Sequence, residues 1–131
     1  MSPRVLLVDD AQDIREIVCM SLERIGGWTV VAVADGEQAL RAAARDGPFD
    51  AVLLDVMMPG LDGPSTLQRL RARGLCDAAK VVFLTAKVQT AELQRLHALG
   101  VAGVIAKPFD PLQLPSQLAE LLGRRPEPTG S

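Results

Sequence analysis

The chain has 131 residues, of which 48% are hydrophobic and 23% charged, a balance typical of a single globular domain. Its net charge of −2 and its scattered Arg and Lys residues argue against direct nucleic-acid binding by this chain alone. No apolar run approaches the roughly 20 residues of a membrane-spanning helix, and no N-terminal signal segment is visible, so we expect no membrane insertion and a cytoplasmic location.

Short apolar runs alternate with helical patterns five times along the chain. In order, the predicted elements are strand 4–8, helix 12–25, strand 28–33, a helix capped by Asp35 that runs to about Arg45, strand 50–54, helix 64–73, strand 80–84, helix 90–99, strand 103–105 and a last helix after Asp110-Pro111. Gln38 completes a capping box with Asp35. Proline has no backbone N–H, so Pro115 predicts that the last helix starts late or kinks there.

Strands that alternate with helices imply right-handed crossovers and a parallel sheet covered on both faces. We therefore predict an α/β fold, a flavodoxin-like sandwich of five βα units with the strand order 2-1-3-4-5. The domain should span residues 1–122. The polar, proline-rich segment 123–131 is typical of a flexible tail or the start of a linker.

Polar side chains stand where the apolar runs stop. Asp9 and Asp10 follow the first run, and three more residues follow the third, fourth and fifth runs: Asp55, Thr85 and Lys107. Because the carboxyl ends of parallel strands meet at one edge of a sheet, we expect all five side chains to gather there. A single aspartate after a strand often only caps the next helix. The joint placement of five such residues favours a ligand site.

Three carboxylates in one crevice repel one another by about 4 kcal/mol per pair at 4 Å and an effective dielectric near 20. Either one carboxyl group retains a proton, or a cation binds, and oxygen ligands with room for water suit Mg²⁺ or Mn²⁺. A dication beside a carboxylate can also hold a phosphoryl group, whose oxygens Lys107 and Thr85 can bind. These residue types together predict a phosphoryl-binding site around an aspartate.

The motifs resemble those of receiver domains in the two-component response-regulator family, over about residues 3–122. The matching motifs are Asp9-Asp10, the stretch Asp-Val-Met-Met-Pro-Gly-Leu-Asp-Gly at 55–63, Thr85-Ala86 and Lys107-Pro108-Phe109. The resemblance implies that Asp55 accepts a phosphoryl group from a sensor histidine kinase or a phosphotransfer protein. It also implies that phosphorylation switches affinity for a downstream protein partner or an effector domain.

A metal site is part of what the resemblance implies. Asp10, Asp55 and the backbone carbonyl of Met57 would bind Mg²⁺ directly, and Asp9 would act through a bound water. The same residues would accept Mn²⁺.

The resemblance further implies how the phosphoryl group is held. Thr85 and Lys107 would bind its oxygens, together with the backbone N–H groups of Met57 and Ala86. The bond between Lys107 and Pro108 is expected to be cis, as is usual in the family.

One position departs from the family pattern. Receiver domains commonly carry Tyr or Phe three residues before the lysine, where the ring swings inward as the threonine moves toward the phosphoryl group. This chain has Val104 there, and a branched aliphatic side chain cannot make a comparable rotamer change. We therefore predict that the signal passes through the 85–89 loop and the helix after it.

Two other functions stay open from the sequence. A phosphohydrolase working through an aspartyl phosphate would use a second acid two residues after the nucleophile, where this chain has Met57. Rapid turnover of a small phosphate ester would favour it. A degenerate receiver acting only as a scaffold would tolerate Asp55→Asn without loss of partner binding. We expect instead a phosphoacceptor, not a true enzyme, that catalyses its own phosphorylation and slow dephosphorylation.

Overall fold

The computed structural model of the chain describes residues 2–123, and within them five parallel strands form one sheet. The strand order is β2-β1-β3-β4-β5, so the predicted flavodoxin-like topology is confirmed. The strands are β1 (Arg4–Val8), β2 (Thr29–Val33), β3 (Ala51–Asp55), β4 (Lys80–Thr85) and β5 (Gly103–Ala106). Residues 124–131 of the predicted tail lie outside the described part of the chain.

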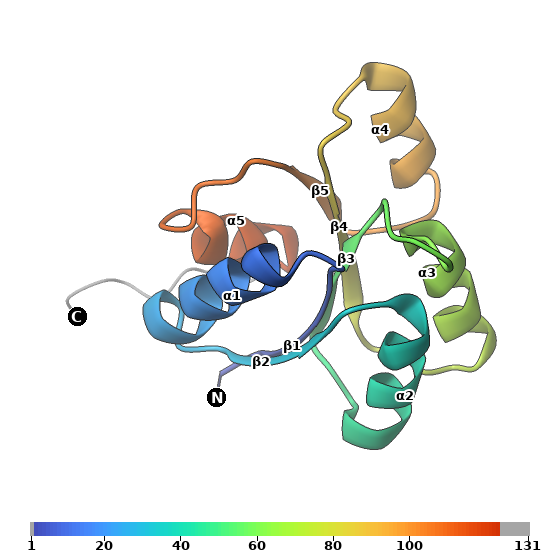
Figure 1. Cartoon of the computed structure of the whole chain (residues 1–131), viewed down its shortest axis with the longest axis horizontal. Coiled ribbons are helices and arrows are strands. Elements are labelled where there is room, and N and C mark those ends of the chain that lie inside the picture. Colours follow the sequence, from blue (N-terminus) through green and yellow to red (C-terminus); the bar gives the residue numbers. More distant parts are fainter. Residues whose placement is uncertain (1, 124–131) are drawn as a thin grey trace.

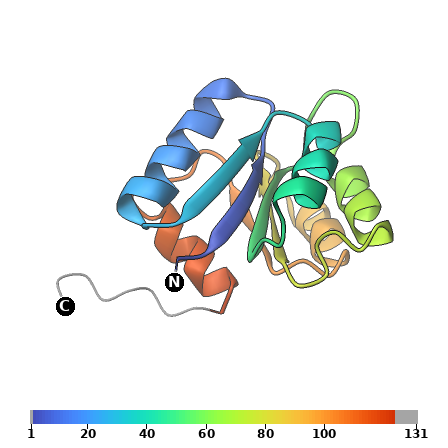
Figure 2. The same cartoon turned by 90° about the horizontal axis from the view of Figure 1, so that it is seen from below.

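Helices cover both faces of the sheet (Figure 1). The first and last helical segments pack side by side on one face, and the other three helices pack on the opposite face (Figure 2). In chain order the segments are α1 (Gln12–Met20), its continuation η1 (Ser21–Ile25), α2 (Gly36–Asp46), α3 (Gly63–Ala72), α4 (Thr90–His97) and α5 (Leu114–Leu121). Over residues 2–123, none of these helices has the length and apolar character needed to cross a membrane.

The alternation of side chains along the strands divides the interior into two cores. In β1, Leu6 and Val8 pack in the core beneath α2, α3 and α4, whereas Val5 and Leu7 pack in the core beneath α1, η1 and α5. All four side chains are fully buried. Apolar residues therefore fill both faces of β1, and the polar residues that follow it are left at the edge of the sheet.

Local signals in the sequence determine where several helices begin. The side chain of Asp35 accepts a hydrogen bond of 2.8 Å from the N–H of Gln38, so the predicted N-cap is confirmed. The Gln38 side chain accepts a hydrogen bond of 2.9 Å from the N–H of Ala34, one residue before the N–H of Asp35 that a capping box would use. Pro115 lies in the first turn of α5, where its missing N–H removes no intrahelical bond. The predicted late start of the last helix is also confirmed.

The first predicted helix, 12–25, ends in a wider π turn that the sequence pattern did not indicate. Ser21 begins this turn and is fully buried. Its hydroxyl donates a hydrogen bond of 2.5 Å to the carbonyl of Pro111, in the connection that leads into α5. The first and last helical segments are thus joined by a side chain as well as by their shared core.

The loop after β3 returns close to the strand that it leaves. A Cβ atom on Gly63 would lie 2.4 Å from the carbonyl oxygen of Asp55, closer than any side chain can approach, so only glycine allows this path. Asp62 caps α3 by accepting a hydrogen bond of 2.8 Å from the N–H of Ser65. The loop is therefore held against the end of β3, where the predicted functional aspartate stands.

Candidate functional site

Three aspartates meet at the carboxyl ends of β1 and β3, as the strand pattern predicted. Asp9, Asp10 and Asp55 each offer a carboxylate oxygen, and these oxygens lie within 4.8 Å of one another. Asp55 is the last residue of β3, and it is buried together with Asp9, whereas Asp10 is exposed. The crevice between the first and third strands therefore gathers negative charge that is only partly open to solvent.

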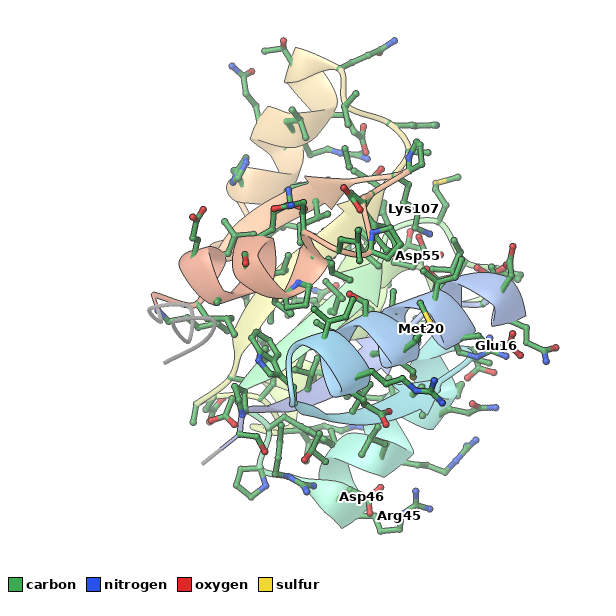
Figure 3. All side chains as sticks on the ribbon, turned by 90° about the vertical axis from the view of Figure 1, so that its left-hand side faces the viewer. Glu16, Met20, Arg45, Asp46, Asp55 and Lys107 are labelled. Carbon is green, nitrogen blue, oxygen red and sulfur yellow. The ribbon has the colours of Figure 1, made fainter. Side chains whose placement is uncertain are left out.

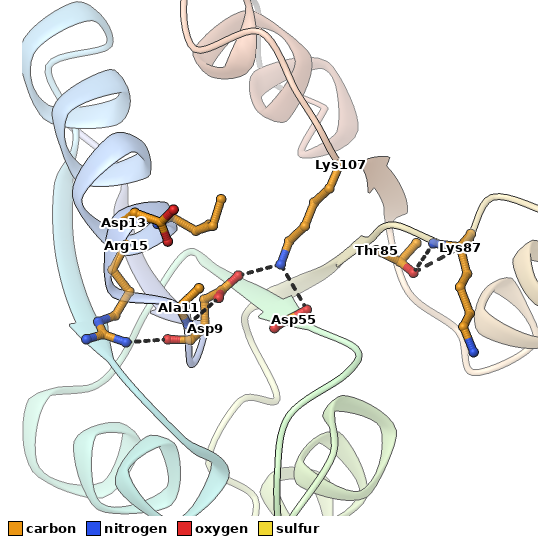
Figure 4. Close-up of polar contacts among 9 residues, drawn as sticks. Asp9, Ala11, Asp13, Arg15, Asp55, Thr85, Lys87 and Lys107 are labelled. Carbon is orange, nitrogen blue, oxygen red and sulfur yellow. Dashed lines mark hydrogen bonds and ion pairs between the residues drawn. The ribbon is translucent and has the colours of Figure 1, made fainter.

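Lys107 is the cation that faces this group. Its ammonium donates hydrogen bonds of 2.8 Å to Asp9 and 3.1 Å to Asp55 (Figure 4). The two side chains of Asp55 and Lys107 lie together at one end of the sheet, far from the Arg45–Asp46 pair at the other end (Figure 3). The peptide bond between Lys107 and Pro108 is cis, as expected.

The charges of this group shift the pKa values of its members. Burial and the neighbouring carboxylate of Asp9 raise the pKa of Asp55 to about 6, although Lys107 works in the opposite direction. Burial lowers the pKa of Lys107, but its hydrogen bonds to Asp9 and Asp55 outweigh burial, and the net shift of that pKa is upward. A single ammonium therefore leaves the three carboxylates undercompensated.

Asp9 has its polar groups engaged with the protein. Its N–H donates to the carbonyl of Val33 at 3.2 Å, and its two carboxylate oxygens accept from the N–H of Ala11 at 2.9 Å and from Lys107 at 2.8 Å. Its carbonyl accepts a hydrogen bond of 2.8 Å from Arg15. These contacts leave Asp9 less able than Asp10 or Asp55 to bind a metal ion directly.

The Thr85 hydroxyl is engaged within its own loop. Thr85 is the last residue of β4 and is buried, and its oxygen accepts a hydrogen bond of 3.0 Å from the N–H of Lys87 (Figure 4). The structure does not bring this hydroxyl into hydrogen-bond contact with the aspartates. Ala86 and Met57, whose backbone N–H groups were predicted to bind the phosphoryl group, are exposed residues of the neighbouring loops. Their roles stay predictions.

The donor set fits a hard dication. Carboxylate oxygens from three side chains converge, one of them exposed to water, and Mg²⁺ and Mn²⁺ favour such ligands while retaining part of their hydration shell. A bound dication would also relieve the repulsion that raises the pKa of Asp55.

Arg15 contacts the site, although the sequence analysis did not select it. Arg15 falls in the first turn of the helix that begins at Gln12. The helix dipole disfavours a cation there. This effect is small, so the sequence does not reveal the partner of Arg15, which the structure identifies as the carbonyl of Asp9.

The family model described as the response regulator receiver domain matches residues 5–119 of the chain. The chain belongs to this family. The receiver is 42% identical over 124 residues to Response regulator MprA of Mycobacterium ulcerans (strain Agy99), a match that covers 95% of this chain and 49% of that protein. It is 34% identical over 124 residues to the alkaline phosphatase synthesis transcriptional regulatory protein PhoP of Bacillus subtilis (strain 168), covering 95% of this chain and 50% of that protein. The chain thus spans about half the length of these relatives.

Solved structures of receivers share the fold. The chemotaxis protein CheY4 of Vibrio cholerae superposes with a TM-score of 0.84 at 30% identity, over 92% of this chain and 99% of that one. The receiver domain of the sensor histidine kinase PA1611 from Pseudomonas aeruginosa PAO1 superposes with a TM-score of 0.80 at 31% identity, over 94% of this chain and 99% of that one. The latter structure has a magnesium ion coordinated in its active-site cleft.

The raised pKa of Asp55 predicts that this residue destabilises the metal-free receiver near neutral pH. The pKa is about 6 in the folded chain against an ordinary value of 3.8, so the free energy of unfolding falls as pH rises from about 4 to about 6 and stays low above that. Asn carries no charge at any of these pH values. Asp55→Asn should therefore raise the free energy of unfolding at pH 7.5 by on the order of 1 to 3 kcal/mol, and by much less at pH 4.

Urea unfolding in the presence of a chelator, at pH 4, 6 and 7.5, measures this difference. Glu120→Gln removes one charge from an exposed position of α5 and serves as the control. A variant Asp55→Asn that is no more stable than the wild type at pH 7.5 would contradict the prediction.

Proposed function

We propose that Asp55 accepts a phosphoryl group from the phosphohistidine of a sensor kinase or a phosphotransfer protein, in a reaction that requires Mg²⁺. The observation that carries this proposal is the carboxylate of Asp55, which is 4% exposed, lies among oxygens of Asp9 and Asp10 within 4.8 Å, and is hydrogen-bonded to Lys107. Membership of the receiver family supports it.

The chemistry balances without another reactant. A carboxylate oxygen of Asp55 attacks the phosphorus atom, the bond between phosphorus and the imidazole nitrogen breaks, and the nitrogen keeps the electron pair. The product on the receiver is an acyl phosphate. Lys107 already holds Oδ1 of Asp55, so its ammonium is in place to bind an oxygen of the incoming phosphoryl group without a large movement. Thr85 would bind another oxygen after its hydroxyl leaves Lys87.

The dication would be held by Asp10, Asp55 and the backbone carbonyl of Met57. It would supply positive charge next to the transferred phosphoryl group. The engagement of both Asp9 oxygens with Ala11 and Lys107 supports an outer role for Asp9, through a bound water. The magnesium ion in the PA1611 receiver supports Mg²⁺ as the resident metal, and Mn²⁺ would suit the same oxygens.

Slow loss of the phosphoryl group is part of the proposal, and rapid enzymatic turnover is not. Hydrolysis needs a group that activates water, and the residue two positions after Asp55 is Met57, an apolar side chain that is 61% exposed. The receiver therefore acts as a phosphoacceptor with limited catalysis of its own.

Mass spectrometry after exposure to acetyl phosphate tests the proposal directly. The wild-type chain should gain the mass of one phosphoryl group in the presence of Mg²⁺ and far less with a chelator, because the carboxylates then repel the donor. Asp55→Asn should gain none, and Asp77→Asn should behave as the wild type. Equal labelling of Asp55→Asn, or labelling that is indifferent to Mg²⁺, would show that another residue or mechanism is responsible.

We propose that the phosphorylated state is transmitted through the loop between β4 and α4. The hydroxyl of Thr85 can bind either the N–H of Lys87, as it does here, or a phosphoryl oxygen on Asp55. Val104 is partly buried against the core and has no ring to reorient, so the 85–89 loop is the available route. The helix that follows, α4, has only Leu96 buried and can shift at low cost.

This route predicts a specific pattern of chemical-shift change in ¹⁵N-resolved spectra. Addition of beryllofluoride and Mg²⁺, which mimic the acyl phosphate, should move the amide resonances of Lys87, Val88 and α4, because the N–H of Lys87 loses its acceptor. Thr85→Ala, which lacks the hydroxyl in both states, should abolish the change at Lys87. Changes confined to the immediate neighbours of Asp55 in the wild type would refute the route.

We propose that the phosphodonor protein contacts the loops around the aspartates. Three of the largest exposed apolar side chains are Met57, Val88 and Leu112, which are 61%, 51% and 69% exposed and follow β3, β4 and β5. Apolar side chains placed around a reactive polar group are typical of a protein contact. A cytoplasmic location for the exchange is part of this proposal.

The output partner is a protein or an effector domain. Relatives such as the Bacillus subtilis regulator are about twice as long as this chain and are named as transcriptional regulators. This length difference supports an output carried out by a separate effector domain, while the receiver itself makes no direct contact with nucleic acid.

Leu112→Asp should separate a protein donor from a small one. Loss of an apolar contact and addition of charge at a protein interface should slow transfer from a phosphorylated histidine phosphotransfer protein by about tenfold or more. Labelling by acetyl phosphate should remain unchanged, because a small donor needs no docking surface. Ile25→Asp is the matched control, because Ile25 is 48% exposed and is the last residue of η1, at the end of the first helical segment that is farther from the aspartates. Equal loss with both donors would mean that Leu112 supports the site itself.

A further inference from the structure

The end of β1 and the start of α1 are joined by an arrangement centred on Arg15. Its guanidinium donates a hydrogen bond of 2.8 Å to the carbonyl of Asp9 (Figure 4). Its backbone N–H donates one of 3.0 Å to the carbonyl of Ala11, the first hydrogen bond of the helix. The carboxylate of Asp9 also accepts a hydrogen bond of 2.9 Å from the N–H of Ala11. The helix has no side chain that caps its N-terminus at Ala11. The hydrogen bonds of Arg15 and Asp9 therefore join the start of this helix to the end of β1.

The bond from Arg15 acts on the peptide unit between Asp9 and Asp10. The carbonyl of that unit belongs to Asp9 and its N–H belongs to Asp10, and the unit is planar, so an anchor on the oxygen fixes the orientation of the whole plane. The preceding peptide is fixed as well, because the N–H of Asp9 donates to Val33 at 3.2 Å. The direction in which the Cα of Asp10 presents its side chain is thereby limited.

We infer that Arg15 is a positioning residue for the metal site, which orients the Asp10 carboxylate by holding the Asp9 carbonyl. This inference rests on the proposed function, since it concerns the same Mg²⁺ site. Asp9 is already held by Lys107 and Ala11, but Asp10 is exposed and lies between two anchored residues. Its carboxylate is the member of the three whose placement depends most on the backbone.

Arg15 does not compete with a metal ion for the carboxylates. The guanidinium binds a backbone oxygen, so no oxygen of the Asp10 or Asp55 carboxylates is used up by it. A lysine in the same place could donate one hydrogen bond but would lack the rigid fork of donors that arginine has. Arg15→Lys should therefore keep part of the effect.

Magnesium titration of the full chain by isothermal calorimetry tests the inference. Outer partners of metal ligands typically contribute about 10-fold to 100-fold to metal affinity, and Arg15 acts through the backbone, so Arg15→Met should weaken Mg²⁺ binding by about tenfold. Met preserves the apolar stem and suits a helix. Arg15→Gln is a second uncharged variant that should weaken binding likewise, and Arg15→Lys should show intermediate affinity.

Arg24→Met is the matched control, because it removes the same charge from an exposed position of η1. It should bind Mg²⁺ as the wild type does. Labelling by acetyl phosphate gives a second readout: at saturating Mg²⁺ Arg15→Met should be labelled at the wild-type rate, and at low Mg²⁺ more slowly. A purely structural defect would slow labelling at both concentrations.

The outcomes separate the two proposals. If the wild type binds Mg²⁺ and is labelled, but Arg15→Met and Arg15→Gln bind Mg²⁺ as tightly as Arg24→Met, the role of Arg15 is refuted while the proposed function stands. A labelling defect of Arg15→Met that saturating Mg²⁺ does not correct refutes the positioning role too. A wild-type chain that binds no Mg²⁺ overturns both proposals.

Discussion

The crowding of three carboxylates around one ammonium group at the end of the sheet is the constraint on which the rest of the structure depends. Lys107 reaches Asp9 and Asp55 at 2.8 and 3.1 Å, yet the pKa of Asp55 remains raised to about 6. The fold holds the aspartates together because β1 and β3, the strands that lead to them, are mostly apolar and buried. A fully buried Leu or Val contributes about 1.5 to 3 kcal/mol. The four such residues in β1 offset a local repulsion of a few kcal/mol.

Much of this arrangement could be predicted from the sequence because it follows from periodicity. In a parallel sheet all strands end at the same edge, so Asp55 and Lys107, which stand at or just after the ends of two strands, were expected there. The structure brings their side chains into contact. The N-cap at Asp35 and the late start at Pro115 were also predictable, since each depends on the chemistry of one or two neighbouring residues. Elements whose cause is local, or whose periodicity is strong, are visible in the sequence.

The features that could not be predicted depend on which of several hydrogen-bond partners a side chain selects, and the sequence pattern does not reveal that choice. Thr85 was correctly placed at the end of β4, but its hydroxyl could bind the adjacent backbone or the site, and the N–H of Lys87 lies within reach. The bond from Arg15 to the Asp9 carbonyl arises only when the strand and helix meet at a particular angle. The π turn at Ser21 likewise reflects a tertiary contact, the hydrogen bond to Pro111. Side-chain direction and helix irregularity are decided by packing, after the elements have formed.

The helices around the sheet are not held equally firmly, and the hydrogen bond from Ser21 to Pro111 is one reason. On one face it ties the first helical segment to the connection before α5, and the two segments share a core, so that layer is stiff. On the other face α2 and α3 each bury several residues, whereas α4 buries only Leu96. A change at the end of the sheet should therefore displace α4 before it displaces the helices that are held more firmly, so the response is directed toward one side of the molecule.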